Sequence, residues 1–229
     1  DLDIANELSI YGRSMQKAKF IKPYQLPVGQ RVFVSFDLGI SDATAMTFSI
    51  INKDNKLEVI HHYHNNGKPT EHFQEYLEDF QKTFGITQNN IILIMPHDSE
   101  NRQDAITHLT SRAEAYRTAG YFVNVLRAIP VKQSIEVTRA SIQHNEIIFW
   151  ENKEIMNMVS LIKQYEYKSN KVTGENLWIP VHGTGLAPSN TCDSLEAVAV
   201  SLFFDKYIKA DQAKHKEFKP RNYSNDWRR

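Results

Sequence analysis

The stretch Arg31–Thr44, RVFVSFDLGISDAT, decides the fold of this chain. Apolar side chains fall on alternate positions from 32 to 36, which is the period-two pattern of a β-strand. The strand ends on Asp37, with Gly39 and Asp42 close behind it. A carboxylate at a strand end beside a glycine is placed to hold a metal ion or a metal-bound phosphate. An acid that opens a turn, with a local cap at Asp42, would give the same pattern, so the rest of the chain has to decide.

The composition suits one large globular domain, or one domain with short appendages. Of the 229 residues, 41% are hydrophobic and 24% are charged, and a chain of this size can bury a substantial core. Lys and Arg together number 27, as do Asp and Glu, so any nucleic-acid surface must be local. Cys192 is the only cysteine, which excludes an intrachain disulfide and a Cys-ligated zinc site. No apolar run reaches membrane-spanning length, so we expect no membrane partner.

The segments after the first strand predict an α/β fold. Residues 43–52 and 57–65 are strand-like and are joined by a short polar turn, which predicts a three-stranded antiparallel meander. The continuous apolar run 90–95 is typical of a strand buried on both faces of a parallel sheet. We therefore expect a central mixed sheet of five or more strands, flanked by helices. The remaining patterns predict a strand at 121–127, an extra β-hairpin over 168–179, helices at 73–84, 104–119, 132–144 and 152–165, and a last helix with Asp193 in its first turn.

Three histidines, His61, His62 and His64, lie on the predicted strand 57–65. Alternation puts His62 and His64 on one face of the sheet and His61 on the other. Because the three do not share a face, we expect solvated strand histidines rather than metal ligands.

Three aspartates can meet at one edge of the predicted sheet. A right-handed crossover makes the strand before Asp98 parallel to the strand that ends in Asp37, and neighbouring strands lie about 4.8 Å apart. Two carboxylates about 4 Å apart repel by roughly 4 kcal/mol at an effective dielectric of 20, unless a cation lies between them. Carboxylate ligands favour Mg²⁺ or Mn²⁺ over zinc. Asp193 could complete the set, although an acid in a first helical turn also suits the helix dipole. Sites with two such cations hydrolyse phosphodiesters.

Three sequence motifs resemble the nuclease domain of the large terminase subunit of tailed bacteriophages, which has a ribonuclease H-like fold. They are FDLGISDATA at the first strand, IMPHDSENRQD after the fourth, and NTCDSLEAVAVSLF in the late helix. The resemblance implies a metal-dependent endonuclease that cuts concatemeric viral DNA during genome packaging. It also implies that Asp37, Asp98 and Asp193 bind two divalent cations, Mg²⁺ or Mn²⁺. Asp42 is a further candidate ligand, and the role of Asp104 stays open.

The resemblance also implies a domain organisation and partners. Residues 1–30 resemble the join to an ATPase motor, 31–208 form the nuclease domain, and 209–229 form a basic tail. The expected partners are double-stranded DNA and, in the full-length protein, the ATPase domain, the small terminase subunit and the portal. The expected location is the host cytoplasm, at the procapsid portal. No GxxxxGK[ST] phosphate loop occurs in the sequence, so we expect the motor to be absent from this chain.

Local basic side chains would supply the DNA affinity, because phosphate contacts are sequence-independent. The candidates are Lys168 and Lys171 on the hairpin and Arg102 and Lys132 near the catalytic edge. The chain departs from the family pattern at Asn190, where many relatives carry a histidine three residues before the last acid. His97 or His182 could take over an auxiliary role.

Three alternatives stay open. FDLGISDAT also fits the phosphate loop of an actin-like or sugar-kinase-like ATPase, although no second glycine-rich phosphate turn follows Gly120. Resolvases and transposases share the ribonuclease H-like chemistry. From a different class, the chain could be a non-catalytic domain that docks on a portal or other partner through its basic tail and exposed tryptophans, Trp178 and Trp227.

Overall fold

A computed structural model of the chain describes residues 8–39, 43–100, 110–170, 173, 175–181 and 187–209. Several residues singled out by the sequence lie outside these ranges. They are Asp42, Arg102, Asp104, Lys171, His182 and the tail from 210 onward.

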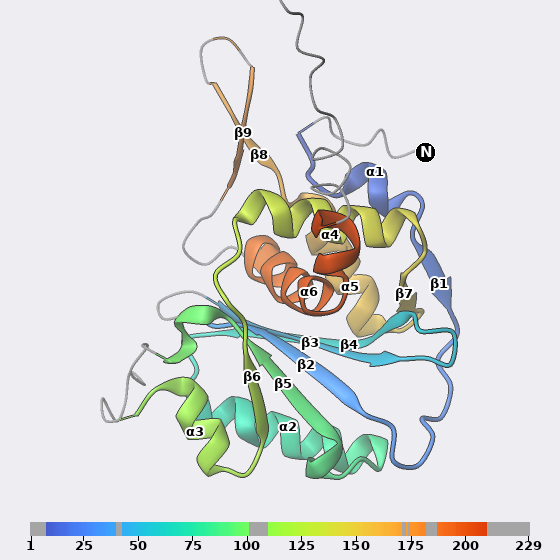
Figure 1. The fold of residues 1–229 in the computed structure, drawn as a ribbon, viewed down its shortest axis with the longest axis vertical. Coiled ribbons are helices and arrows are strands. Elements are labelled where there is room, and N and C mark those ends of the chain that lie inside the picture. The colour runs from blue at the N-terminus through green and yellow to red at the C-terminus, as the bar shows by residue number, and fades with distance from the viewer. Residues whose placement is uncertain are drawn as a thin grey trace, which may run out of the picture.

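A seven-stranded mixed sheet forms the centre of the molecule, in the order β1-β7-β4-β3-β2-β5-β6 (Figure 1). The predicted antiparallel meander is confirmed, since β3 pairs with both β2 and β4. The predicted parallel neighbour of β2 is also confirmed, because β5 pairs with it in parallel. The strands are β1 (Lys19–Ile21), β2 (Val32–Asp37), β3 (Ala43–Ile51), β4 (Leu57–Asn66), β5 (Ile91–Met95), β6 (Phe122–Val125) and β7 (Ile147–Trp150).

The sequence did not predict β1 or β7, which extend the sheet at the β4 edge. Both pairings are parallel, β1 with β7 and β7 with β4. The four-residue run of β7 is too short for its period to distinguish a strand from a buried helical turn. The three residues of β1 carry no alternation that could be read alone.

Helices cover both faces of the sheet (Figure 1). α2 (Thr70–Phe84) and α3 (Arg112–Thr118) lie on one face, where Phe80 of α2 stacks on Phe48 of β3 with ring centroids 4.2 Å apart. α6 (Ala187–Phe204) lies on the other face, together with α1 (Gly12–Met15), α4 (Val131–Gln143) and α5 (Lys153–Gln164). Short turns complete the described structure: η1 (Gln88–Asn90), η2 (His97–Glu100) and the π-helical η3 (Asp205–Lys209). The described helices include none that is long and apolar enough to cross a bilayer.

α6 begins six residues before Asp193, so this acid lies in the second turn rather than in the predicted first turn. Pro188 is the second residue of the helix, and proline is well tolerated in a first turn because its missing N–H would have no helical partner there. The correction weakens the helix-dipole explanation of Asp193, since the dipole acts within the first turn.

The described part of the expected leader packs on the body of the fold. Ile10 and Tyr11 are buried, and β1 is a strand of the central sheet. The division of the chain at 30/31 and 208/209 stays a prediction.

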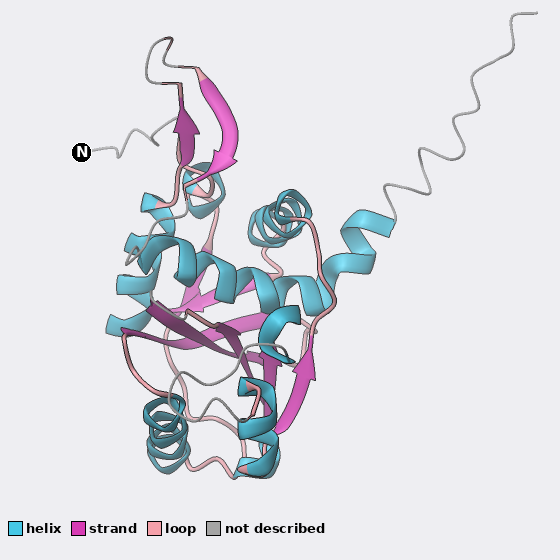
Figure 2. Cartoon of the chain, turned by 90° about the vertical axis from the view of Figure 1, so that its left-hand side faces the viewer, coloured by secondary structure: helices cyan, strands magenta, loops and turns pink. Residues whose placement is uncertain are grey.

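The predicted hairpin is present as β8 (Tyr167–Ser169) paired antiparallel with β9 (Asn176–Pro180). It projects away from the sheet on the side of α4, α5 and α6 (Figure 1 and Figure 2). Lys168 is exposed on it, and so is an apolar run. The side chains of this run, Leu177, Trp178 and Ile179, are 45%, 71% and 51% exposed.

Candidate functional site

A pocket of about 250 Å³ lies at the carboxyl ends of β2 and β5, where α4 and α6 pass over the sheet edge. The three aspartates singled out by the sequence, Asp37, Asp98 and Asp193, all line it. They are far apart in the chain, and the topology of an open α/β sheet brings them together at the edge where such folds bind ligands. The other lining residues are Phe36, Pro96, His97, Leu126, Arg127, Ile129, Val131, Ser134, Glu196, Ala197 and Val200.

Asp37 is the last residue of β2, and a side chain from α6 holds its carboxylate. Asn190 Nδ2 donates a hydrogen bond of 2.7 Å to Asp37 Oδ2. Asn190 is only 4% exposed, and its other amide atom, Oδ1, is buried and has no hydrogen-bond partner among the residues that the structure describes. The carboxylate fixes the orientation of the amide, because the reverse orientation would place two acceptors against each other.

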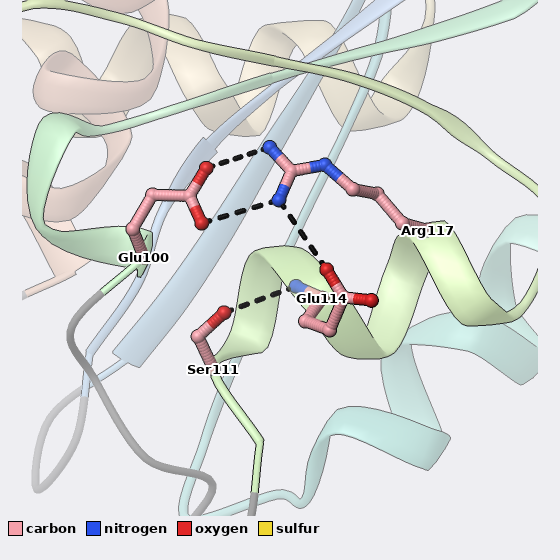
Figure 3. Close-up of polar contacts among 4 residues, drawn as sticks. All are labelled: Glu100, Ser111, Glu114 and Arg117. Atoms are coloured by element: carbon pink, nitrogen blue, oxygen red, sulfur yellow. Dashed lines mark hydrogen bonds and ion pairs between the residues drawn. The ribbon is translucent and has the colours of Figure 1, made fainter.

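Asp98 lies in η2, the turn that follows β5 after Pro96. This turn is braced against α3, as Figure 3 shows. Arg117 donates two hydrogen bonds to the Glu100 carboxylate, of 3.1 and 2.6 Å, and lies 3.6 Å from Glu114. Ser111 caps α3 by accepting a hydrogen bond from the Glu114 amide. The hydrogen bonds from Arg117 lower the pKa of Glu100. The carboxylate is therefore charged at neutral pH, and it accepts both hydrogen bonds from Arg117 in this form.

Glu196 is a pocket residue that sequence reasoning missed. It lies on α6 one turn after Asp193, lines the same pocket and is 4% exposed. Tyr11 donates a hydrogen bond of 2.6 Å to Glu196 Oε1. Burial raises the pKa of Glu196 to about 8, with the hydrogen bond from Tyr11 acting against the shift and the Asp37 charge adding to it. The i, i+3 spacing of the two acids could have indicated that they share a helical face.

Arg127 was also missed. It follows β6, lines the pocket and is exposed, and its guanidinium carbon lies 4.9 Å from the centre of the Phe204 ring. Among the described residues it forms no ion pair with a pocket carboxylate. Its place after a parallel strand, at the ligand-binding edge, was the available signal.

A buried polar layer seats α6 on the sheet. His62 of β4 lies between two threonine hydroxyls, with Nδ1 3.3 Å from Thr47 Oγ1 and Nε2 3.2 Å from Thr191 Oγ1. Thr47 Oγ1 also lies 2.8 Å from Ser194 Oγ. Burial lowers the pKa of His62 to about 3, so the ring is neutral. The prediction of a solvated histidine is therefore wrong for His62, because helices cover both faces of the sheet.

His61 and His64 are half-buried, and alternation assigned the faces correctly, because the ring of His64 lies 5.5 Å from that of His62 whereas His61 contacts Tyr76 of α2. His61 faces α2, where its Nε2 lies 2.6 Å from the Tyr76 hydroxyl.

The pocket fits a hard divalent cation in the chemistry of its donors. Its four acids offer only oxygen ligands, and Asn190 Oδ1, beside Asp37, is a buried oxygen without a partner in the described part of the chain. Within the described ranges, however, no three His, Cys, Asp or Glu side chains already form a group that could hold a metal ion. The four acids therefore share one cavity without already forming a ligand group.

The other predicted site residues are placed as follows. His97 is exposed and lines the pocket. Lys132 is exposed in the first turn of α4, next to the lining residue Val131. Lys168 is on the hairpin and does not line the pocket. Arg102, Lys171, His182 and Asp42 lie outside the described residues.

No family model and no curated protein matches this sequence. Solved structures do match the fold. A large terminase from a thermophilic bacteriophage, in complex with ADP, aligns with a TM-score of 0.64 and 18% identity, over 89% of this chain and 47% of that one. The chain thus spans about half the length of that ADP-bound terminase.

Two nuclease structures match along most of their length. The P22 large terminase nuclease domain gives a TM-score of 0.57 at 12% identity, over 86% of this chain and 89% of that one. The large terminase nuclease of the thermophilic phage G20c, with bound magnesium, gives 0.58 at 11% identity, over 85% and 97%. Because both nuclease chains are covered almost whole, the chain has the fold of a terminase large-subunit nuclease domain, the ribonuclease H-like fold.

Proposed function

We propose that this chain is a divalent-metal-dependent endodeoxyribonuclease of a viral genome-packaging motor, which cuts concatemeric DNA by two-metal phosphodiester hydrolysis. The observation that carries the proposal is the meeting of Asp37, Asp98 and Asp193 in one pocket at the ligand-binding edge of the sheet. The matching G20c nuclease has been solved with bound magnesium and with bound cobalt. Both ions are divalent, which agrees with the oxygen ligands of this pocket.

In this proposal the three aspartates hold two cations, Mg²⁺ or Mn²⁺. When bound, the cations supply an activated water and stabilise the charge on the attacking and leaving oxygens. Asn190 keeps the Asp37 carboxylate in one orientation through its 2.7 Å hydrogen bond. Arg127 places a positive charge at the pocket wall, where it can contact a phosphate of the substrate.

DNA binding in this proposal uses exposed basic side chains around the pocket and on the hairpin. Lys132 lies next to the pocket and Lys168 on β8, and Arg102 and Lys171 are further candidates. His97 lines the pocket and is the auxiliary candidate among the described residues. Replacing Lys168 and Lys171 together by alanine is expected to weaken DNA binding without unfolding the domain. Unchanged affinity at low salt would remove the hairpin from the proposed interface.

The wider organisation is also a proposal. Residues 1–30 would connect to an ATPase domain, 31–208 would form the nuclease, and 209–229 would form a basic tail. The partners would be double-stranded DNA, the small terminase subunit and the portal, at the procapsid in the host cytoplasm. The ADP-bound terminase, about twice as long as the matched region, is consistent with a longer parent protein.

Cleavage of supercoiled plasmid tests the proposal. The protein is incubated with EDTA, Mg²⁺ or Mn²⁺, beside Asp98→Asn and the matched control Asp79→Asn. Asp79 is an exposed acid on α2, on the opposite face of the sheet. We expect cleavage only with a divalent ion, loss of cleavage in Asp98→Asn and full cleavage in the control. A protein that neither cuts DNA nor binds Mn²⁺ by calorimetry would contradict the proposal.

A non-catalytic docking domain is the second candidate, because the hairpin exposes the apolar run 177–179. A docking domain would keep its partner binding after Asp98→Asn and would not respond to Mn²⁺. The ATPase alternative has less support, since the matched nuclease chains are covered almost whole.

A further inference from the structure

Tyr11 reaches from the N-terminal segment to the wall of the acidic pocket. Its side chain is 0% exposed, and its hydroxyl donates a 2.6 Å hydrogen bond to Glu196, 185 residues further along the chain. Glu196 lines the same pocket as Asp37, Asp98 and Asp193. The N-terminal segment, α6 and the pocket are therefore joined by one buried contact.

The backbone around Tyr11 is held firmly enough to fix the position of its phenol. The Ile10 amide donates to the Tyr165 carbonyl at 2.8 Å, and the Tyr167 amide donates to the Leu8 carbonyl at 2.9 Å. The rings of Tyr11 and Tyr165 are stacked with centroids 6.4 Å apart. These contacts tie the segment to the chain that links α5 to β8, so Tyr11 presents its hydroxyl from a rigid support.

A purely structural role does not explain Glu196. A buried carboxylate is costly unless its oxygens are paired; Oε1 accepts the hydrogen bond from Tyr11, and the side chain lines the acidic cavity. Three further acids line the same cavity, and like charges in a low-dielectric site repel one another. A cation in the pocket would offset the repulsion among the four carboxylates, which gives a reason for an acid at this position.

We propose that Tyr11 is a positioning residue of the metal pocket, which acts by holding Glu196 at the pocket wall as a fourth carboxylate for divalent-cation binding. This inference rests on the proposed function. Because linkage is reciprocal, cation binding should in turn stabilise the packing of the N-terminal segment on the pocket. Cation affinity would then depend on the packing of the N-terminal segment, and the stability of that packing would depend on cation binding.

Calorimetric titration with Mn²⁺ tests the inference. The variants are Tyr11→Phe, which keeps the buried ring, and Glu196→Gln, which keeps the shape of the side chain. A second tyrosine–glutamate pair supplies matched controls, since Tyr24 donates a 2.9 Å hydrogen bond to the buried Glu58, and neither residue lines the pocket. The controls are Tyr24→Phe and Glu58→Gln.

We expect Glu196→Gln to weaken Mn²⁺ binding about tenfold and Tyr11→Phe about threefold, with the controls within about twofold of the parent protein. Tyr11→Phe should recover cleavage at saturating Mn²⁺, because it keeps all four acids. Amide hydrogen exchange in residues 8–15 should slow on Mn²⁺ addition in the parent and not in Glu196→Gln.

Parent-like Mn²⁺ affinity in both Tyr11→Phe and Glu196→Gln would overturn the inference, even if both variants were less stable. If Glu196→Gln did not fold, parent-like affinity of Tyr11→Phe alone would overturn it. Failure of the proposed function looks different. In that case the parent protein itself would bind no Mn²⁺ and Asp98→Asn would behave like the parent.

Discussion

Lowering the pH from 7 to 5 should destabilise the protein through His62, the buried histidine under α6. The ring is 5% exposed and contacts two hydroxyls, and burial lowers its pKa from 6.5 to about 3. Below pH 6.5 the unfolded chain binds a proton on this residue and the folded chain does not. The stabilising contribution of the neutral ring is therefore complete above pH 6.5 and is lost as the pH falls toward 3.

The magnitude follows from the width of this window. At pH 5 the unfolded state lies about 1.5 pH units below its pKa, and each unit corresponds to about 1.36 kcal/mol, which gives a loss of roughly 2 kcal/mol. Domains of this kind are stable by about 5–15 kcal/mol, so the loss is readily measured. It also bears on function, because α6 carries Asn190, Asp193 and Glu196.

Urea unfolding at pH 7 and pH 5 measures the effect in the parent protein and in His62→Gln. Glutamine can still contact Thr47 and Thr191 but does not titrate. We expect the variant to be less stable at pH 7 and to lose about 2 kcal/mol less than the parent on acidification. All other titrating groups are common to both proteins and cancel in the comparison. Equal losses in the two proteins would refute the assignment of His62 as a buried neutral base.

Three further predictions concern the pocket and its supports. Asn190→Ala should lower cleavage about tenfold at limiting Mn²⁺, because a hydrogen bond to a charged group contributes about 1.5–3 kcal/mol; parent-like cleavage would show that the bond to Asp37 is dispensable. Arg127→Ala should weaken DNA binding and reduce the slope of log affinity against log salt by about 1, as measured by fluorescence anisotropy over a salt series. Arg117→Ala should lower the free energy of unfolding by at most about 1 kcal/mol, because its pair with Glu100 is exposed; a larger loss in thermal unfolding would mean that this brace carries more than a surface ion pair.

The sequence predicted the part of the fold that carries the strongest local signals. The alternation in β2 and the continuous apolar run of β5 identified both strands, and the right-handed crossover made them parallel neighbours. That pairing was enough to bring Asp37 and Asp98 to one pocket. The edge strands β1 and β7 are three and four residues long, and their pairing depends on partners far away in the sequence.

The pocket residues that were missed depend on packing rather than on local pattern. In the sequence, Glu196 is one of several acids on predicted helices. Only the packing of α6 on the sheet buries it and brings it into contact with Tyr11. The prediction that His62 is exposed to solvent was wrong for a related reason. A solvated strand histidine requires one open face of the sheet, whereas helices cover both faces of this one, as is usual for sheets with parallel strands.

The polar residues of α6 form two stripes, and these explain why this buried helix carries the pocket. Spacing by three residues keeps side chains on neighbouring parts of a helical face. Asn190, Asp193 and Glu196 form one stripe, which reaches Asp37 and the pocket. Thr191 and Ser194 form the second stripe, which contacts the polar layer on the sheet. The second stripe fixes the rotation of the helix about its axis, and that rotation determines where the acids of the first stripe point. Thr191→Val leaves the acids intact but alters the polar layer, so it should weaken Mn²⁺ binding. Val198→Ala changes the apolar side of the helix, so it should lower the free energy of unfolding with little effect on the Mn²⁺ affinity of the folded protein.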